Sequence, residues 1–296
     1  MIDIIFLGTS CMQPTKTRNH SGILLSYNGE SILMDCGEGI QRQLRIAGIK
    51  PAKITRLLIS HWHGDHVFGI PGLMSTMGAD KAEITLHIYG PVGTKKYLEY
   101  LFKSFASKDI IKYEVMEVTK GIIFENEDYR LEAQPLKHSV PCVGYSFIEK
   151  GRLRINVAKA EKMGLEGPIL GKLQKGEEVI LGGKKIKPKE VTYPVEEKKV
   201  SYIADTVPCN GADALAKNAD LLISEGTHLD DIKEKTEKYM HLTVKQAALI
   251  ASENNAKKLV VTHLSQRYKS VAEIAEEARQ HFDNSIIAED FMKIRV

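Results

Sequence analysis

Residues 61–66 read His61-Trp62-His63-Gly64-Asp65-His66 and place four potential metal ligands within six positions. They follow the apolar run 56–60, which predicts a strand. Because residues i and i+2 of an extended chain project to the same side, His61 and His63 can bind one ion together. Gly64 allows the chain to turn, so that Asp65 and His66 can face a second ion. Imidazole and carboxylate ligands suit zinc, and a catalytic zinc site keeps a position open for water.

Three more residues that can bind metal follow apolar runs later in the chain. His138 follows the run 129–133, Asp205 follows 200–204, and His263 follows 259–262. Open α/β sheets place their functional sites at the ends of strands, so we expect these side chains to join the hexapeptide. The sequence therefore predicts a metal centre rather than a chance cluster of histidines in a polar loop.

The hexapeptide is the hallmark of the metallo-β-lactamase superfamily, and the chain resembles that superfamily over its whole length. The resemblance implies an α/β protein with the αβ/βα sandwich fold, which hosts many different chemistries. It also implies two zinc ions per subunit, with manganese or another divalent metal as a possible replacement. In this assignment one ion is held by His61, His63 and His138, the other by Asp65, His66 and His263, and Asp205 lies between them.

Three further features resemble ribonuclease Z, the endonuclease that removes 3′ trailers from tRNA precursors. The first is a Pro-x-Lys-x-Arg-Asn loop, formed here by Pro14, Lys16, Arg18 and Asn19. The second is a glutamate–histidine pair, matched by Glu225 and His241. The third is the segment 262–268, which has the family's Thr-His-Phe-Ser-x-Arg-Tyr pattern with Leu264 in place of phenylalanine.

The resemblance implies a zinc-dependent endoribonuclease that cleaves after the discriminator nucleotide. Two metal ions can lower the pKa of a shared water, and the resulting hydroxide would attack the phosphorus. Asp65 is a candidate to accept the proton of that water, and His241, oriented by Glu225, is the candidate general acid. The products would be tRNA with a 3′-hydroxyl and a trailer with a 5′-phosphate. Arg267 could bind a phosphate oxygen, and the 14–19 loop could bind the first nucleotides beyond the cut.

The basic excess of the chain is concentrated in one segment. The net charge is +3, but residues 150–199 hold 13 Lys or Arg and 7 Asp or Glu, whereas the rest of the chain holds 28 and 31. This is the charge distribution of a phosphate-binding appendage, although a solvated lysine-rich insert is an equal alternative from charge alone. In ribonuclease Z a flexible arm with a Gly-Pro motif leaves the core at this place and clasps tRNA. Gly167 and Pro168 match that motif, so we expect one domain, 1–296, with an inserted basic exosite arm at 150–195.

Strand and helix patterns alternate on both sides of this insert. We expect strands at 2–7, 22–27, 31–34, 57–60 and 84–89, helices at 38–47, 67–77 and 94–105, and three or four hairpin-like strands between 113 and 148. After the insert we expect strands at 200–204, 221–224 and 258–262, and helices at 213–217, 230–238, 244–253 and 271–281. Two such halves around a central insert predict a sandwich with the metal centre at the sheet edges.

Bulk properties indicate a cytoplasmic protein. The sequence has no apolar run near the ~20 residues of a membrane helix and no pattern of a signal peptide. Its four cysteines are scattered, which favours free thiols in a reducing compartment. By resemblance to the short form of ribonuclease Z, we expect a homodimer that binds a tRNA precursor and no membrane.

Two alternatives differ from this interpretation in testable features. Another hydrolase on the same scaffold, such as a phosphodiesterase or a glyoxalase-II-like thioesterase, would share the metal ligands but lack the Glu225–His241 pair, the 14–19 loop and the basic insert. A non-catalytic tRNA-binding subunit would be expected to have lost metal ligands, and all seven are present.

Overall fold

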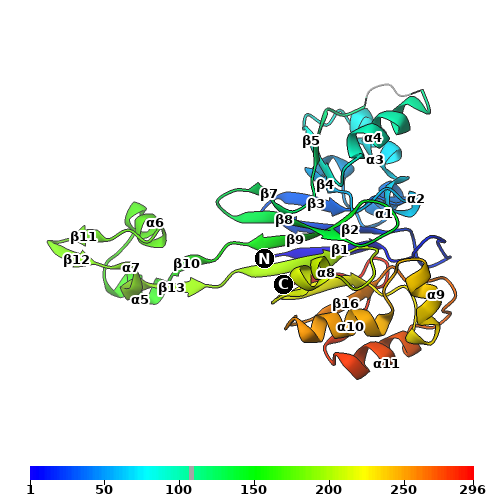
Figure 1. The fold of residues 1–296 in the computed structure, drawn as a ribbon. Helices are drawn as coiled ribbons and strands as arrows, with labels where there is room; N and C mark the ends of the chain where they lie inside the picture. The colour runs from blue at the N-terminus through cyan, green and yellow to red at the C-terminus, as the bar shows by residue number, and fades with distance from the viewer. Residues whose placement is uncertain (107–109) are drawn as a thin grey trace. The chain divides into compact units, whose positions relative to one another are not determined.

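The computed structural model describes residues 1–106 and 110–296. The chain forms two compact units. The larger unit comprises Met1–Phe124, Leu131–Phe147 and Lys199–Val296. Two seven-stranded sheets form its centre, with helices on their outer sides (Figure 1). This four-layered arrangement is the predicted αβ/βα sandwich.

The first sheet has the strand order β18-β1-β2-β3-β4-β5-β6. Its strands are β1 (Asp3–Gly8), β2 (Gly22–Tyr27), β3 (Glu30–Met34), β4 (Arg56–Leu58), β5 (Leu86–Gly90), β6 (Tyr113–Glu117) and β18 (Lys293–Arg295). β1, β2 and β3 pair antiparallel, whereas β3 to β6 pair parallel. The outer face packs against α1 (Ile40–Ile46), α3 (Ile70–Ala79) and α4 (Thr94–Lys103) through one apolar cluster. The short elements Pro51–Lys53 (3-10) and α2 (Gly64–Val67) flank β4.

The second sheet has the strand order β17-β16-β15-β14-β9-β8-β7. Its strands are β7 (Gly121–Glu125), β8 (Tyr129–Leu136), β9 (Cys142–Glu149), β14 (Lys198–Ile203), β15 (Leu221–Glu225), β16 (Leu259–Thr262) and β17 (Ser285–Ile287). β14 to β17 pair parallel. A second apolar cluster joins this sheet to α8 (Asn210–Ala216), α10 (Val244–Glu253) and α11 (Ala272–His281). A 3-10 turn (Asp230–Ile232) leads into α9 (Lys233–Lys238).

The inner faces of the two sheets meet through aromatic side chains. The Tyr27 and Phe147 rings lie 5.2 Å apart in an edge-to-face arrangement, and the Tyr145 hydroxyl donates to the Ile59 carbonyl at 2.7 Å. Alternation along the strands explains this core, because one set of side chains faces the helices and the other faces the opposite sheet.

The structure corrects three of the expected elements. The helix expected at 67–77 is interrupted after Phe68: α2 begins at Gly64 and α3 at Ile70. The strands between 113 and 148 are not all hairpin partners, since β6 pairs parallel with β5 in the first sheet and β7 to β9 belong to the second. The short strands β17 and β18 were not expected, and β18 closes the edge of the first sheet beside β1.

The smaller unit comprises Glu125–Arg130 and Ile148–Lys198. It contains two hairpin-like sheets, β10 (Arg152–Ile155) with β13 (Thr192–Val195) and β11 (Val179–Leu181) with β12 (Lys184–Ile186). Its helices are α5 (Val157–Lys162), α6 (Pro168–Gln174) and α7 (Pro188–Val191), which share a small apolar cluster of their own. Gly167 has φ +63° and Pro168 is the first residue of α6, a position that suits proline because its missing N–H would have no partner there. No helix in the described part of the chain is long and apolar enough to span a bilayer.

Candidate metal centre and active site

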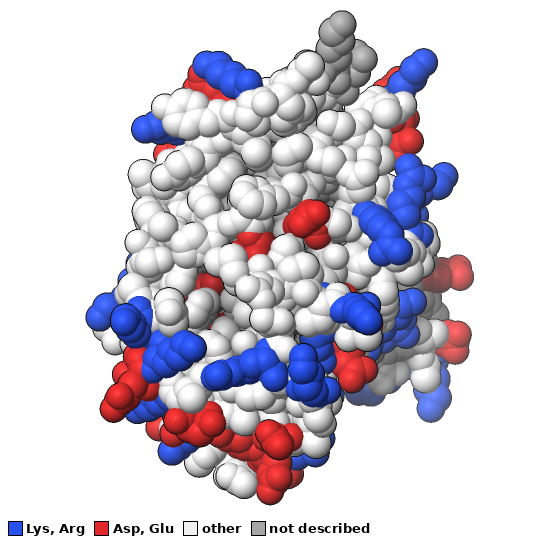
Figure 2. Space-filling view, turned by 90° about the vertical axis from the view of Figure 1, so that its right-hand side faces the viewer, with Lys and Arg blue, Asp and Glu red and all other residues white. Residues whose placement is uncertain are grey.

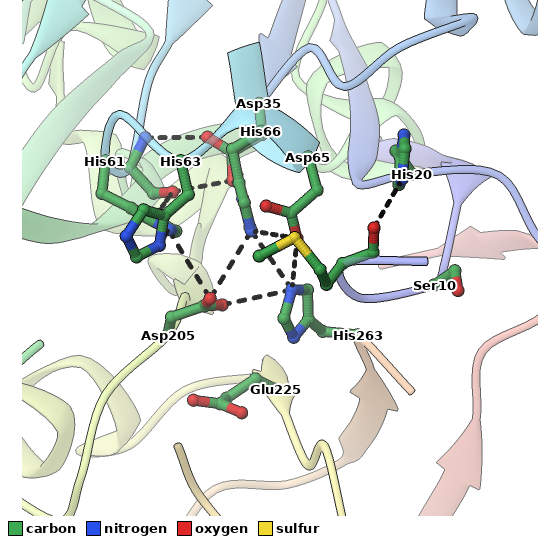
Figure 3. A network of polar contacts seen from close by, with 12 residues as sticks. Ser10, His20, Asp35, His61, His63, Asp65, His66, Asp205, Glu225 and His263 are labelled. Carbon is green, nitrogen blue, oxygen red and sulfur yellow. Dashed lines mark hydrogen bonds and ion pairs between the residues drawn. The ribbon is translucent and has the colours of Figure 1, made fainter. Parts of the chain in front are cut away.

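The predicted metal ligands converge at the carboxyl ends of strands from both sheets. The 61–66 hexapeptide follows β4, His138 follows β8, Asp205 follows β14, and His263 follows β16. Figure 3 shows Asp205 and His263 approaching the histidines of the hexapeptide from the opposite sheet. The cluster of predicted ligands therefore lies between the two halves of the fold.

Three groups of described side chains have the spacing needed to hold a metal ion; two of them correspond to the predicted ligand sets, and the third, Asp205, His241 and His263, overlaps them. His61, His63, His138 and Asp205 form one group, and Asp65, His66 and His263 form the other; within each group the ligand atoms lie within 4.8 Å of one another. One Asp205 oxygen lies 3.5 Å from His61 Nε2 and 3.6 Å from His66 Nε2, so this carboxylate contacts both groups. This is the position expected of a ligand shared by two ions.

Hydrogen bonds outside the cluster fix the ring orientation of four histidines. His66 Nδ1 donates to the Asp35 carboxylate at 2.8 Å, and His138 Nδ1 donates to the Met240 carbonyl at 2.9 Å. The Ser60 hydroxyl donates to Asp35 and therefore accepts from His61 Nδ1 at 3.0 Å. In each case Nδ1 is engaged by a partner outside the cluster and Nε2 faces the centre, the arrangement that metal-binding histidines require.

The fourth histidine is fixed in the same way from the second half of the chain. The Thr227 hydroxyl donates to Glu225 Oε2 at 2.6 Å, so it accepts from His263 Nδ1 at 3.0 Å. The Nε2 atoms of His263 and His66 then lie only 3.1 Å apart. A proton shared by the two rings, or a metal ion bound by both, would offset the repulsion between their lone pairs at this distance.

The carboxylates of the site also fit a cation. Within the described residues, Asp65 Oδ1 and Asp205 Oδ1 are buried side-chain atoms that take part in no hydrogen bond. Burial alone would raise the pKa of Asp205, but His263, His66 and the neighbouring histidines hold that pKa well below its usual range. Burial likewise opposes the charged form of His66, yet Asp205, Asp65 and Asp35 hold its pKa well above the ordinary value. The centre therefore contains buried negative charge, and imidazole and carboxylate ligands of this kind fit divalent metal ions.

A glutamate–histidine pair lies beside the metal cluster. His241 Nδ1 is 3.2 Å from Glu225 Oε2 and 3.7 Å from Asp205 Oδ2. Burial alone would lower the pKa of His241, but the carboxylates of Glu225 and Asp205 outweigh that effect and raise it to about 9. Glu225 is buried at the end of β15 and also accepts from the Thr206 N–H at 2.8 Å, so its position is fixed. The pair brings a protonated imidazole to the edge of the metal centre.

These groups line a cavity of about 490 Å³. Its walls include proposed metal ligands, His241, the loop at 11–13, and residues 238–240 at the end of α9. Cys11 lines this cavity, where burial, reinforced by the Asp205 and Asp65 carboxylates, raises the pKa of its thiol to about 12. The cavity is large enough to admit a substrate group to the metal centre.

The 14–19 loop divides into a structural and an exposed part. The Arg18 guanidinium donates to Thr9 Oγ1 and to the Ala288 carbonyl, both at 2.6 Å. The Asn19 side chain donates to the Glu38 carbonyl at 2.7 Å. Pro14 and Lys16 are exposed. Arg18 and Asn19 therefore hold the loop in place, while Lys16 is available to a ligand.

The remaining substrate residues predicted from the sequence lie outside the metal cavity. Arg267 is exposed next to the ring of Tyr268, and its guanidinium carbon lies 6.0 Å from the ring centroid. Gly167 and Pro168 belong to the smaller unit. Their roles in binding RNA stay predictions.

Sequence reasoning missed Asp35, Ser60 and Thr227. Asp35 is buried, and its carboxylate also accepts from the Ser60 N–H and the Tyr202 hydroxyl, each at 2.8 Å. A usable signal was present for Asp35, because it directly follows the strand β3, just as the metal ligands follow theirs.

Comparisons with known proteins agree with this architecture. Residues 2–152 match the family model described as anti-Pycsar protein Apyc1. The metallo-β-lactamase fold protein YhfI from Bacillus subtilis superposes with a TM-score of 0.71 at 20% identity, covering 99% of this chain and 98% of that structure. The chain is thus a metallo-β-lactamase-fold protein, whose His/Asp cluster is suited to divalent metal.

Similarity over the full length defines the family more narrowly. The chain is 43% identical to ribonuclease Z of Methanothermobacter thermautotrophicus, covering 100% of this chain and 97% of the relative. It is 37% identical to ribonuclease Z of Protochlamydia amoebophila, with 98% and 95% covered. Human tRNase Z, short form, superposes with a TM-score of 0.73 at 29% identity, covering 99% of both chains. The chain belongs to the ribonuclease Z family.

Proposed function

We propose that this protein is a metal-dependent endoribonuclease that removes the 3′ trailer of tRNA precursors after the discriminator nucleotide. Full-length membership of the ribonuclease Z family supports the reaction and its substrate. The observation that carries the proposal is the Glu225–His241 pair at 3.2 Å beside the metal cluster. Cleavage of a phosphodiester needs an activated water on one side of phosphorus and a proton for the leaving oxygen on the other, and the site offers groups for both.

The residues would divide the reaction between the two halves of the chain. His61, His63, His138, Asp65, His66, His263 and the shared Asp205 would hold two divalent ions, which we expect to be zinc. Bound ions of this kind lower the pKa of a water molecule and neutralise charge on the phosphate. Asp65 would accept the proton of the attacking water. Because Glu225 holds His241 through Nδ1, the Nε2–H of His241 would protonate the leaving 3′ oxygen, giving tRNA with a free 3′-hydroxyl and a trailer with a 5′-phosphate.

The test is cleavage of an end-labelled tRNA precursor that carries a 3′ trailer. The metal-loaded parent should cut once, after the discriminator nucleotide. His241→Ala should keep its metal content and lose about 10²–10⁴-fold in rate, the usual contribution of a general acid. His281→Ala, which removes a histidine at the end of α11, is the matched control and should cleave like the parent. Hydrolysis of small phosphodiesters or thioesters without any RNA cleavage would contradict the proposal.

We also propose that the smaller unit supplies the exosite for the tRNA body. Its lysines and the Gly167–Pro168 turn support this, since phosphate contacts from lysine give affinity without reading sequence. Replacing Lys184, Lys185 and Lys187 together by alanine should raise KM and flatten its salt dependence, with little change in kcat. A homodimer and a cytoplasmic location remain predictions; sedimentation of the purified protein as a monomer would exclude the dimer.

A further inference from the structure

His228 is a histidine of the metal cavity that the proposed reaction does not use. It lines the same cavity as His241 and directly follows Thr227 in the chain. Its side chain is half-buried, and its backbone is held in place because the Val244 N–H donates to the His228 carbonyl at 2.8 Å. His228 belongs to none of the three described groups that could hold a metal ion, so its ring is available to a substrate.

The hydrogen bonds of Thr236 determine which ring nitrogen of His228 carries the proton. Thr236 is fully buried in α9, and its hydroxyl oxygen lies 3.1 Å from the Ile232 carbonyl and 3.2 Å from His228 Nδ1. A carbonyl can only accept, so the hydroxyl donates its one proton to Ile232 and accepts from Nδ1–H. In the neutral ring the other nitrogen, Nε2, then carries a lone pair and acts as an acceptor.

The surroundings of the ring favour its neutral form. Burial, together with the nearby charges of His241 and Arg267, lowers the pKa of His228 to about 4. The ring is therefore uncharged at neutral pH. Within the described residues Nε2 has no hydrogen-bond partner, so it can accept a hydrogen bond from a donor in the cavity.

Thr236 also holds His241, the proposed general acid. The His241 N–H donates to the Thr236 carbonyl at 3.1 Å, while the Thr236 hydroxyl accepts from His228. The two histidines therefore belong to one wall of the cavity and are fixed through one buried residue. A substrate group next to the atom that His241 protonates would lie near His228.

The surface around this wall can receive an RNA backbone. Figure 2 turns toward the viewer the side that carries α2 and α9 in Figure 1. It shows a few acidic groups near the middle of the face and a band of Lys and Arg side chains beneath them. Lys235 and Lys238 of α9 are exposed, and Lys238 also lines the metal cavity. A polyanion would thus approach His228 over basic surface, which favours its binding.

We propose that His228 accepts a hydrogen bond from the ribose 2′-hydroxyl of the discriminator nucleotide and so selects RNA over DNA at the cut. This inference rests on the proposed function. The leaving group of that reaction is the 3′ oxygen of the discriminator nucleotide, and the 2′-hydroxyl is bonded to the neighbouring ribose carbon. When His241 faces the 3′ oxygen, the 2′-hydroxyl lies beside it, where the same wall presents His228. The 2′-hydroxyl is the group by which a protein distinguishes RNA from DNA, and its O–H can donate to Nε2.

The test compares two tRNA precursors that differ only in the sugar of the discriminator nucleotide, ribose in one and 2′-deoxyribose in the other. The kcat/KM of the parent should be about fivefold higher for the ribose precursor, the effect of one hydrogen bond between uncharged groups. In His228→Ala this preference should disappear. His228→Gln, which places an amide oxygen near the position of Nε2, should restore a preference for ribose. His281→Ala, which removes a histidine of α11 that does not line the cavity, should keep the preference of the parent.

The outcomes separate this inference from the proposed function. If the parent cleaves both precursors equally well, or if His228→Ala lowers kcat/KM equally for both, His228 does not bind the 2′-hydroxyl, although the proposed function stands. A third precursor, with purine riboside in place of an adenosine discriminator, lacks the amino group of the base. A loss of rate confined to that precursor, and absent in His228→Ala, would assign the contact to the base and overturn the ribose assignment. If the metal-loaded parent cleaves no precursor, the proposed function is refuted and the role of His228 with it.

Discussion

Replacing Asp35 by asparagine should weaken metal binding although Asp35 touches no metal-facing atom. Its carboxylate is fully buried and accepts four hydrogen bonds of 2.8 Å, from the Ser60 N–H and hydroxyl, His66 Nδ1 and the Tyr202 hydroxyl. One oxygen accepts from the Ser60 N–H and the other accepts the remaining three bonds. Through Ser60 the same group also sets the proton position on His61. One carboxylate therefore prepares a ligand in each of the two metal groups.

An asparagine of the same shape cannot satisfy these donors. If its oxygen faces the three donors, its NH₂ group opposes the Ser60 N–H, which leaves a buried backbone donor unsatisfied at about 1–3 kcal/mol. The three remaining bonds lose the charge on their acceptor and with it roughly half of their strength. We therefore expect the free energy of unfolding to fall by about 3–5 kcal/mol. Loss of such a supporting partner also lowers metal affinity by about 10–100-fold.

Two measurements separate these effects. Competition with a chromogenic chelator gives the metal affinity of the folded variant, and denaturant unfolding of the metal-free protein gives its stability. Asp80→Asn is the matched control, because Asp80 is exposed and, among the described residues, its carboxylate pairs with the exposed Arg45 alone, at 3.5 Å. An Asp35→Asn protein that binds metal as tightly as the parent would refute the argument that Asp35 orients His66 and His61.

Three further predictions concern residues around the site. Thr227→Val should slow cleavage about tenfold, because it removes the donor to Glu225 and the acceptor of His263, and Thr227→Ser should restore most of the rate. Arg18→Ala should lower the free energy of unfolding by about 1–3 kcal/mol, measured by denaturant titration, since it leaves the Ala288 carbonyl without its donor. The Cys11 thiol should react slowly with iodoacetamide at pH 8 in the metal-free protein, because a pKa of about 12 leaves almost no thiolate. Mass spectrometry would measure the extent of alkylation over time, and rapid alkylation of Cys11 would contradict this prediction.

The convergence of the proposed metal ligands could be predicted from sequence because their signal is local. Each follows a short apolar run, and polar side chains at the carboxyl ends of parallel strands meet at one edge of a sheet. His61 and His63 alternate along an extended segment, which places them together without knowledge of the rest of the fold. The structure confirms the sandwich and places these side chains in two groups.

The supporting hydrogen bonds could not be predicted in the same way. Tyr202 reaches Asp35 across 167 positions, and Thr227 meets His263 across 36, so neither contact follows from periodicity. Tertiary packing also decided details of the strands. The sequence of β6 looks like the start of a series of hairpins, but β6 pairs with β5. Because the helix α4 connects β5 to β6, the two strands run parallel in the same sheet.

The distribution of the site along the chain explains why the metal ligands alone do not define the reaction. The segment matched by the Apyc1 family model, residues 2–152, contains five of the seven proposed ligands: His61, His63, Asp65, His66 and His138. The Glu225–His241 pair lies outside it, as do Asp205 and His263. Thr227 links that pair to His263 through two short hydrogen bonds, so the glutamate that orients the proposed proton donor and a proposed metal ligand contact the same side chain. A substitution in the second half of the chain can therefore change how the leaving oxygen is protonated, while the first half keeps its proposed metal ligands. Full-length similarity, rather than the hexapeptide, is for this reason the stronger support for ribonuclease activity.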